Sequence, residues 1–223
     1  MEDHEKIHIM DNEICPISGE TRMEEIVNHW THRVAMLLSI VGLPILILYG
    51  IMHGDEWRIA SYSIFGVSLV LLYVVSTYYH GCQTHQTKQK LRVIDHACIF
   101  LLIAGSYTPF VLGPLRESIG WALFATEWTI AVVGISLKIF AFNRTRVISL
   151  IAYLAMGWLI VFWWSDLSQI LSETTLTLIA VGGLSYTLGV IFFLWESLPF
   201  NHAIWHVFVF GGSACHYIAI LLI

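Results

Sequence analysis

The sequence predicts an all-α integral membrane protein with seven transmembrane helices. Hydrophobic residues make up 57% of the 223 residues and charged residues only 12%, whereas about 25% of a soluble globular chain is charged. The mean hydropathy is +0.72. This composition excludes a soluble enzyme, a disordered chain and a nucleic-acid-binding protein, and leaves a chain that crosses the lipid bilayer several times.

Seven apolar segments follow one another, each long enough to cross a hydrocarbon core of about 30 Å as a helix. They must be helices, because lipid offers no partners to backbone groups and the runs are too long for barrel strands. We expect the spans near residues 34–52, 59–80, 93–113, 118–137, 147–165, 174–195 and 201–223. Residues 26–223 are therefore expected to form one seven-helix membrane domain.

Residues 1–25 are expected to form a polar cytoplasmic tail, since they contain eight of the sixteen acidic residues. Lysine and arginine in short loops set the orientation, because cytoplasmic loops carry an excess of them. On the side of the membrane that holds the N-terminus, the chain has nine such residues, namely Lys6, Arg22, Arg33, Lys88, Lys90, Arg92, Lys138, Arg144 and Arg146. The opposite side has only Arg58 and Arg116. The bias predicts a cytoplasmic N-terminus, an outside C-terminus and, if the cell is bacterial, an inner-membrane location.

Polar residues that are unusual in membrane spans fall at one predicted depth, although they are far apart in sequence. With the N-terminus inside, odd-numbered spans start and even-numbered spans end at the cytoplasmic leaflet. The residues concerned are Asn28 and His32, Ser76 and His80, Asp95 and His96, and His202 and His206. This common depth predicts a functional site at the cytoplasmic end of the helices.

A metal site is the chemistry that these histidines favour. His202 and His206 have the spacing H-x3-H, which puts both imidazoles on one helix face and lets them bind one metal ion, as in H-E-x-x-H. His80, at the matching depth, is the candidate third ligand. Three histidines would leave one position of a tetrahedral Zn²⁺ open for water, the pattern of catalytic sites. The alternative from spacing alone is a pair of histidines at a membrane interface.

Asp95 and Ser76 are the candidate catalytic residues. A carboxylate in a span costs on the order of 3 kcal/mol, so it usually faces a partner or water. Asp95 can accept a proton from a metal-bound water, orient a ligand histidine, or merely cap the third helix. Ser76 lies four residues before His80. Its hydroxyl can hydrogen-bond a substrate oxygen or a carbonyl of its own helix.

Three further polar residues are set apart from this site. His96 points about 100° away from Asp95 around the helix, and His216 lies about 15 Å beyond His206 at 1.5 Å per residue. Glu127 sits in the middle of the fourth span, where an acid is a functional candidate by default unless a tyrosine or serine on a facing helix bonds it. No lysine follows Arg146, which excludes a retinal protein.

Three segments together resemble a known family. E-I-V-N-H-W-T-H (residues 25–32), S-T-Y-Y-H (residues 76–80) with Asp95 downstream, and H-A-I-W-H (residues 202–206) are similar to the three signature motifs of the hemolysin III branch of the progestin and adipoQ receptor family, to which the adiponectin receptors belong. The resemblance covers residues 24–223. It implies seven helices with the N-terminus inside and a Zn²⁺ ion in the cytoplasmic half.

The resemblance also assigns roles to residues. His80, His202 and His206 match the zinc ligands. Asp95 matches the acid that reaches the metal through water, and Ser76 the serine of the second motif. The residues of the first motif are interpreted as structural, namely Glu25, Asn28 as a cap of the helix leading into the first span, and His32 as a brace for the site.

Three functions follow from this reading. The first is a zinc-dependent hydrolase of a membrane lipid amide or ester, because the resemblance suggests a relationship to alkaline ceramidases, which are intramembrane zinc amidases. The second is a receptor or regulator of membrane lipid homeostasis with a structural zinc. The third is a cytolytic membrane protein, as the family name suggests. An open zinc position beside an acid favours the hydrolase, and four protein ligands would favour the second function.

Overall fold

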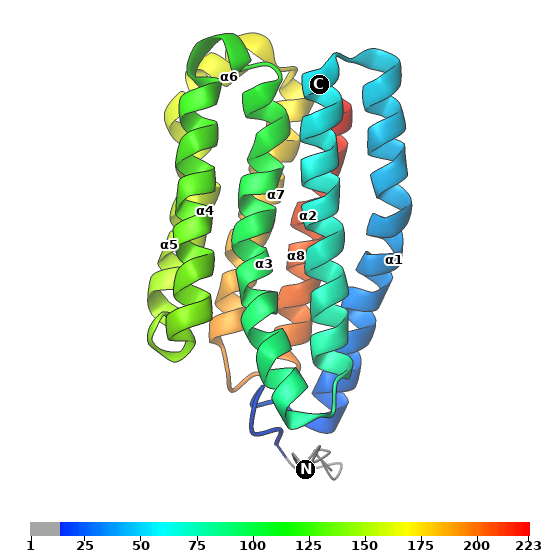
Figure 1. Cartoon of the computed structure of the whole chain (residues 1–223), viewed down its shortest axis with the longest axis vertical. Helices are drawn as coiled ribbons and strands as arrows, with labels where there is room; N and C mark the ends of the chain where they lie inside the picture. Colours follow the sequence, from blue (N-terminus) through cyan, green and yellow to red (C-terminus); the bar gives the residue numbers. More distant parts are fainter. Residues whose placement is uncertain (1–13) are drawn as a thin grey trace.

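Within residues 14–223, which the computed structural model describes, seven helical segments are long and apolar enough to cross a membrane. They run side by side along the long axis of the molecule, and no β-sheet occurs among these residues (Figure 1). The helices are α1 (Arg22–His53), α2 (Glu56–Gly81), α3 (His85–Leu112), α4 (Trp121–Ala141), α5 (Arg146–Trp158), α6 (Trp164–Ile170), α7 (Glu173–Leu194) and α8 (Asn201–Leu221). The predicted all-α seven-span fold is confirmed.

Two of the seven spans are built from more than one helical piece. A π-helical turn (Arg116–Gly120) leads directly into α4, and together they form the fourth span. The fifth span consists of α5, a 3-10 segment (Leu159–Trp163) and α6. The described part of the chain therefore has eight α-helices but seven spans.

Helix α1 begins much earlier than the predicted start near residue 34. Thr21 is its N-cap: the Thr21 hydroxyl accepts a hydrogen bond from the Glu24 N–H at 3.3 Å, and the Glu24 carboxylate accepts one from the Thr21 N–H at 2.9 Å. This reciprocal capping box satisfies backbone donors that the helix cannot satisfy itself. The prediction that Asn28 caps a helix is therefore wrong, since Asn28 lies inside α1 and is fully buried.

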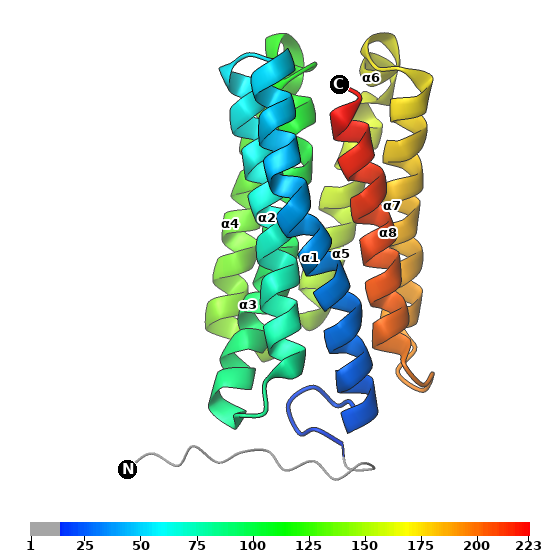
Figure 2. The same cartoon turned by 90° about the vertical axis from the view of Figure 1, so that its right-hand side faces the viewer.

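The described residues before α1 fold against the end of α2. Cys15 donates its backbone N–H to the Glu20 carbonyl at 2.8 Å, and Gly19 turns the chain with φ of +83°, a conformation that glycine adopts without steric cost. Cys15 and Ile17 are buried beside Tyr79. Figure 2 shows this turn beneath α1. It brings the acidic residues just before α1 close to the ends of α2 and α8.

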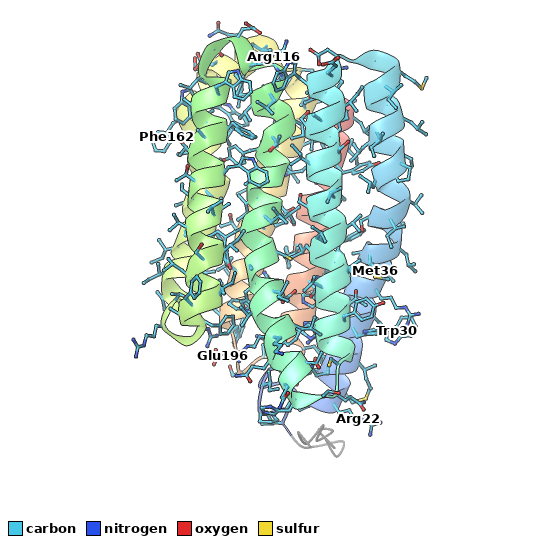
Figure 3. All side chains as sticks on the ribbon, viewed as in Figure 1. Arg22, Trp30, Met36, Arg116, Phe162 and Glu196 are labelled. Carbon is cyan, nitrogen blue, oxygen red and sulfur yellow. The ribbon has the colours of Figure 1, made fainter. Side chains whose placement is uncertain are left out.

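The outer surface of the bundle is apolar. Phe162 and Phe140 are 81% and 86% exposed, and Trp30 is also exposed; Figure 3 shows Trp30 and Phe162 projecting from the ribbon. Exposed apolar side chains all around a bundle are expected for helices that contact lipid, whereas a soluble monomer rarely exposes such large patches.

Polar contacts inside the bundle fix α8 against α1 and α2. The Tyr62 hydroxyl donates to the Ile220 carbonyl at 2.6 Å, the Tyr73 hydroxyl to Ser213 Oγ at 2.9 Å, and the Tyr217 hydroxyl to the Gly42 carbonyl at 2.8 Å. These bonds sit in an apolar core shared by the three helices. They set the register of α8, which carries the H-x3-H pair.

One end of the bundle gathers the start of α1, the end of α2 and the starts of α3 and α8 (Figure 2). Arg22 and Glu196 lie at this end, while Arg116 lies at the opposite end, together with the C-terminus (Figures 1 and 3). The polar residues expected at one depth are therefore carried by helix ends that meet. The orientation of the bundle in the membrane remains a prediction from the charge bias.

Candidate metal centre

His80, His202 and His206 meet at this end of the bundle. One ring nitrogen of each lies within 4.8 Å of the others. His80 and His206 are buried, and the His202 side chain is 13% exposed. The Nε2 atoms of all three rings are buried without a hydrogen-bond partner among the described residues. Buried polar atoms are normally hydrogen-bonded, so three orphaned nitrogens facing one point are the arrangement that holds a metal ion.

Glu25 orients the first of these histidines. Its Oε2 lies 2.7 Å from His80 Nδ1, and its Oε1 accepts from Lys88 Nζ at 2.8 Å and from Ser18 Oγ at 2.5 Å. A carboxylate can only accept, so the His80 proton sits on Nδ1 and leaves the Nε2 lone pair for a metal. Metal-binding histidines commonly have such a partner.

Thr31 orients His206 in the same way. Thr31 Oγ1 donates to the Asn28 carbonyl at 2.9 Å and lies 3.0 Å from His206 Nδ1. Since the hydroxyl proton is already used, the His206 Nδ1–H donates to Thr31, and the Nε2 lone pair is free. Two of the three candidate ligands are thus held by neighbours on α1.

The start of α8, which carries His202, is tied to the start of α1. The Phe200 N–H donates to Glu24 Oε1 at 3.0 Å, and Phe200 itself has φ of +58°, a strained value for this residue. Glu20 Oε1 lies 4.0 Å from His202 Nδ1. Burial, and then repulsion from Glu24 and Glu25, raises the pKa of Glu20 to about 7. The Glu20 carboxyl therefore exchanges a proton near neutral pH.

Asp95 and Ser76 lie beside each other, Ser76 one helical turn before His80 on α2, and Asp95 does not belong to the group of ligand atoms. The prediction that Asp95 might cap the third helix is wrong, because α3 begins ten residues earlier, at His85. The carboxylate hydrogen-bonded to His80 is Glu25, and within residues 14–223 Asp95 has no such bond to His80, His202 or His206, so its role in orienting a ligand stays a prediction. Ser76 Oγ is buried without a partner in the described chain, which rules out the bond to its own helix.

His32 and Asn28 border the trio from α1. The His32 ring stacks on the His206 ring with centroids 3.4 Å apart, and meets the Tyr73 ring edge-on at 5.2 Å. Both ring nitrogens of His32 and both amide atoms of Asn28 are buried and unpartnered within residues 14–223. The first motif thus places, next to the trio, side chains whose hydrogen-bond donors and acceptors have no partner in the described chain.

The residues set apart in the sequence stay outside the trio. His216 packs edge-on against Tyr186, with its Nε2 3.4 Å from the Ile179 carbonyl. His96 Nδ1 donates to the Arg92 carbonyl at 2.9 Å. Glu127 is fully buried and its carboxyl oxygens have no partner in the described part of the chain, so the predicted tyrosine or serine partner is absent there.

A cavity of about 140 Å³ is lined by His32, whose ring stacks on that of His206. Helices α3, α5, α7 and α8 supply most of its walls, and these are mainly apolar; Ser76, Asp95 and His216 are among its polar lining residues. The two candidate catalytic residues therefore face an apolar cavity next to a neighbour of the trio.

A seven-helix membrane protein with a buried histidine trio at one end is the class that this fold and site define. The chain matches the profile of the family described as "Haemolysin-III related" over residues 20–217. It belongs to that family, which confirms the resemblance to the hemolysin III branch of the progestin and adipoQ receptors, and it is a multi-pass integral membrane protein.

Named relatives cover nearly the whole chain. It is 45% identical over 201 residues to the "Hemolysin-3 homolog" of Bacillus subtilis (strain 168), covering 90% of this chain and 94% of that protein. It is 44% identical over 198 residues to the "Hemolysin-3" of Bacillus cereus, covering 89% and 90%. It is 32% identical over 227 residues to the human "Monocyte to macrophage differentiation factor", covering 94% and 89%.

Proposed function

We propose that this protein is a zinc-dependent hydrolase that cleaves an amide or ester of a membrane lipid. The observation that carries the proposal is the trio of imidazoles with unpartnered Nε2 atoms, together with Asp95 and Ser76 on a neighbouring apolar cavity. The positive-charge bias indicates that this end of the bundle faces the cytoplasm.

The donor set fits Zn²⁺. Neutral imidazoles are borderline ligands that zinc accepts readily, and His80, His202 and His206 would hold it. No fourth histidine, cysteine or carboxylate within residues 14–223 joins the group, which matches zinc sites that keep one position open for chemistry. When bound there, Zn²⁺ would supply Lewis-acid polarisation of a carbonyl and a water of lowered pKa.

Asp95 and Ser76 would act on the reacting atoms. The Asp95 carboxylate lies outside the group of ligand atoms but beside Ser76 on the same cavity, and we assign it the role of accepting a proton from the attacking water and passing it to the leaving group. The Ser76 hydroxyl makes no hydrogen bond to its own helix in the described chain, and we assign it the role of donating to the carbonyl oxygen of the substrate. The apolar cavity would hold an acyl chain and exclude bulk water.

Purified protein is expected to carry about one Zn²⁺ per chain, because the trio forms one site. Elemental analysis by inductively coupled plasma mass spectrometry, on protein never exposed to chelator, measures this directly. Metal-free protein would contradict the proposal. A Soret band would point instead to a haem held by two of the histidines.

Turnover tests the activity itself. A panel of long-chain N-acyl amides and esters is incubated with the protein in detergent, and released fatty acid is quantified. Chelator treatment is expected to abolish release, and Zn²⁺ to restore it. Zinc-loaded protein that cleaves no member of the panel would favour a non-enzymatic receptor or regulator in which zinc is structural.

Glu25→Gln is expected to weaken zinc binding by about 10- to 100-fold, the usual cost of losing a partner of a metal ligand. Glutamine keeps the size of the side chain but loses the charge that holds the Nδ1 proton of His80. Zinc affinity is measured by competition with a fluorescent chelator. Glu173→Gln, which changes an exposed acid at the start of α7, is the matched control. Equal affinities in the two variants would show that Glu25 does not support the site.

A further inference from the structure

Lys138, near the end of α4, is a buried cation without a counter-ion. Only 2% of its surface is exposed, and it makes no hydrogen bond or ion pair with any described residue. Its nearest charged neighbours are Arg92 and Arg146, which are also positive. A buried unpaired charge is costly and usually faces a partner or a polar cavity. The positive-inside bias does not explain its burial, since Lys90 serves that bias while exposed.

Two of these cations lie over the same aromatic ring. Lys138 Nζ lies 5.0 Å and Arg92 Cζ 5.1 Å from the centroid of the same ring, that of Phe142. Such contacts offset only part of the cost of burying an unpaired ammonium. The cluster of Arg92, Lys138 and Arg146, here called the basic cluster, therefore has more positive charge than the described residues around it neutralise.

The carboxylates near the basic cluster are engaged elsewhere. Glu196 forms an exposed ion pair with Arg146. Asp95, which lines the same cavity, lies beside Ser76 and 3.9 Å from His96 Nδ1. Neither carboxylate makes an ion pair with Lys138 within residues 14–223, so the ammonium is open to an anionic ligand.

The cavity joins the basic cluster to an apolar space. Lys138 and Arg146 both line it, at the end where Ser76 and Asp95 also face it. The rest of the lining is mainly apolar and aromatic, formed by side chains such as Leu150, Leu154, Trp158, Val190 and Phe193. A positive end and a long apolar remainder match an amphiphile with one negatively charged end.

We propose that the cavity binds a single-chain lipid with a phosphate headgroup, whose phosphate contacts Lys138 and Arg146 and whose acyl chain lies between α3, α5, α7 and α8. Lysine and arginine are the side chains that bind phosphate oxygens best. The inference rests on the proposed function in taking the ligand to be a lipid, and it defines the class of that lipid as anionic. It does not depend on zinc or on hydrolysis.

The test uses ether-linked lipids, which the proposed hydrolase cannot cleave. Native mass spectrometry of the full chain in non-ionic detergent measures binding of hexadecyl lysophosphatidic acid and of hexadecylglycerol, which has the same ether-linked chain but no phosphate. The phosphate lipid is expected to bind about tenfold more tightly, because only its phosphate accepts charged hydrogen bonds from Lys138 and Arg146. Equal affinities would overturn the proposal. Glycerol phosphate that competes as well as the lipid would show that the ligand is a free phosphate.

Lys138→Met tests the residue. It is expected to abolish the preference for the phosphate lipid over hexadecylglycerol, and Lys90→Met, at an exposed position, is expected to keep that preference. The lipid-free Lys138→Met protein should also melt at a higher temperature than wild type, because an unpaired buried charge is removed; a lower melting temperature would show that Lys138 is structural. Arg146→Gln, at an exposed position, should weaken the preference without affecting folding. An unchanged preference in both variants would overturn the proposal, whether or not the turnover assay succeeds.

Discussion

His80→Ala and His206→Ala are each expected to remove nearly all bound zinc, whereas His216→Ala should retain it. Each of the first two changes deletes one of three ligands whose Nε2 atoms converge, and the loss should exceed the roughly 100-fold effect of a partner such as Glu25. His216 is partly buried in the same bundle but lies about 15 Å further along α8, where it contacts Tyr186 and the Ile179 carbonyl.

Zinc is quantified per chain in the three variants after identical purification, with size-exclusion profiles and melting temperatures recorded on the same samples. His216→Ala controls for the loss of a buried imidazole from the same helix. Equal zinc loss in all three variants would show that the histidines matter for folding alone. If the His80→Ala variant retained all of its zinc, His80 would not be a ligand and α2 would contribute no ligand to the site.

Hydropathy predicted the number and order of the spans, because burial in lipid requires long apolar runs. It placed the start of the first helix too late for a physical reason. The first turns of α1 carry Glu24, Glu25, Asn28 and His32, which are polar because they cap the helix or face the trio. A polar helical turn that points into a site looks like a loop to any measure based on apolar composition.

The three candidate ligands could be predicted from spacing and depth, since H-x3-H fixes one helix face and the topology puts His80 at the same level. The partner of His80, Glu25, could not be predicted in this way. Glu25 lies at the end of a stretch that reads as an acidic tail, and its contact with His80 depends on how residues 14–21 fold against α2. Its place in the first motif was the one available signal. The burial of Lys138 could not be predicted either. The sequence places it just after the fourth predicted span, where it looks like an ordinary loop cation, and its burial depends on how α4 packs against α3 and α5.

Asp95→Asn is expected to lower lipid hydrolysis by about 10²- to 10⁴-fold, the usual contribution of a general base, while zinc content hardly changes. Asp95 is buried on α3, beside Ser76 and at the edge of the cavity, but outside the group of ligand atoms. Asparagine keeps the size and hydrogen bonding of the side chain, so folding and the three imidazoles should persist. It lacks only the basicity needed to take a proton from water.

The measurement combines released fatty acid and zinc content on the same samples of wild type and Asp95→Asn. Asp166→Asn, at an exposed position in α6 near the opposite end of the bundle (Figure 1), is the matched control and should match wild type in both. If Asp95→Asn loses its zinc, Asp95 is a fourth ligand, the site is closed by protein groups, and a structural zinc becomes the better interpretation. If it keeps both zinc and full activity, the proton must go to another group, and Glu20, whose pKa of about 7 is suited to the task, becomes the residue to change next.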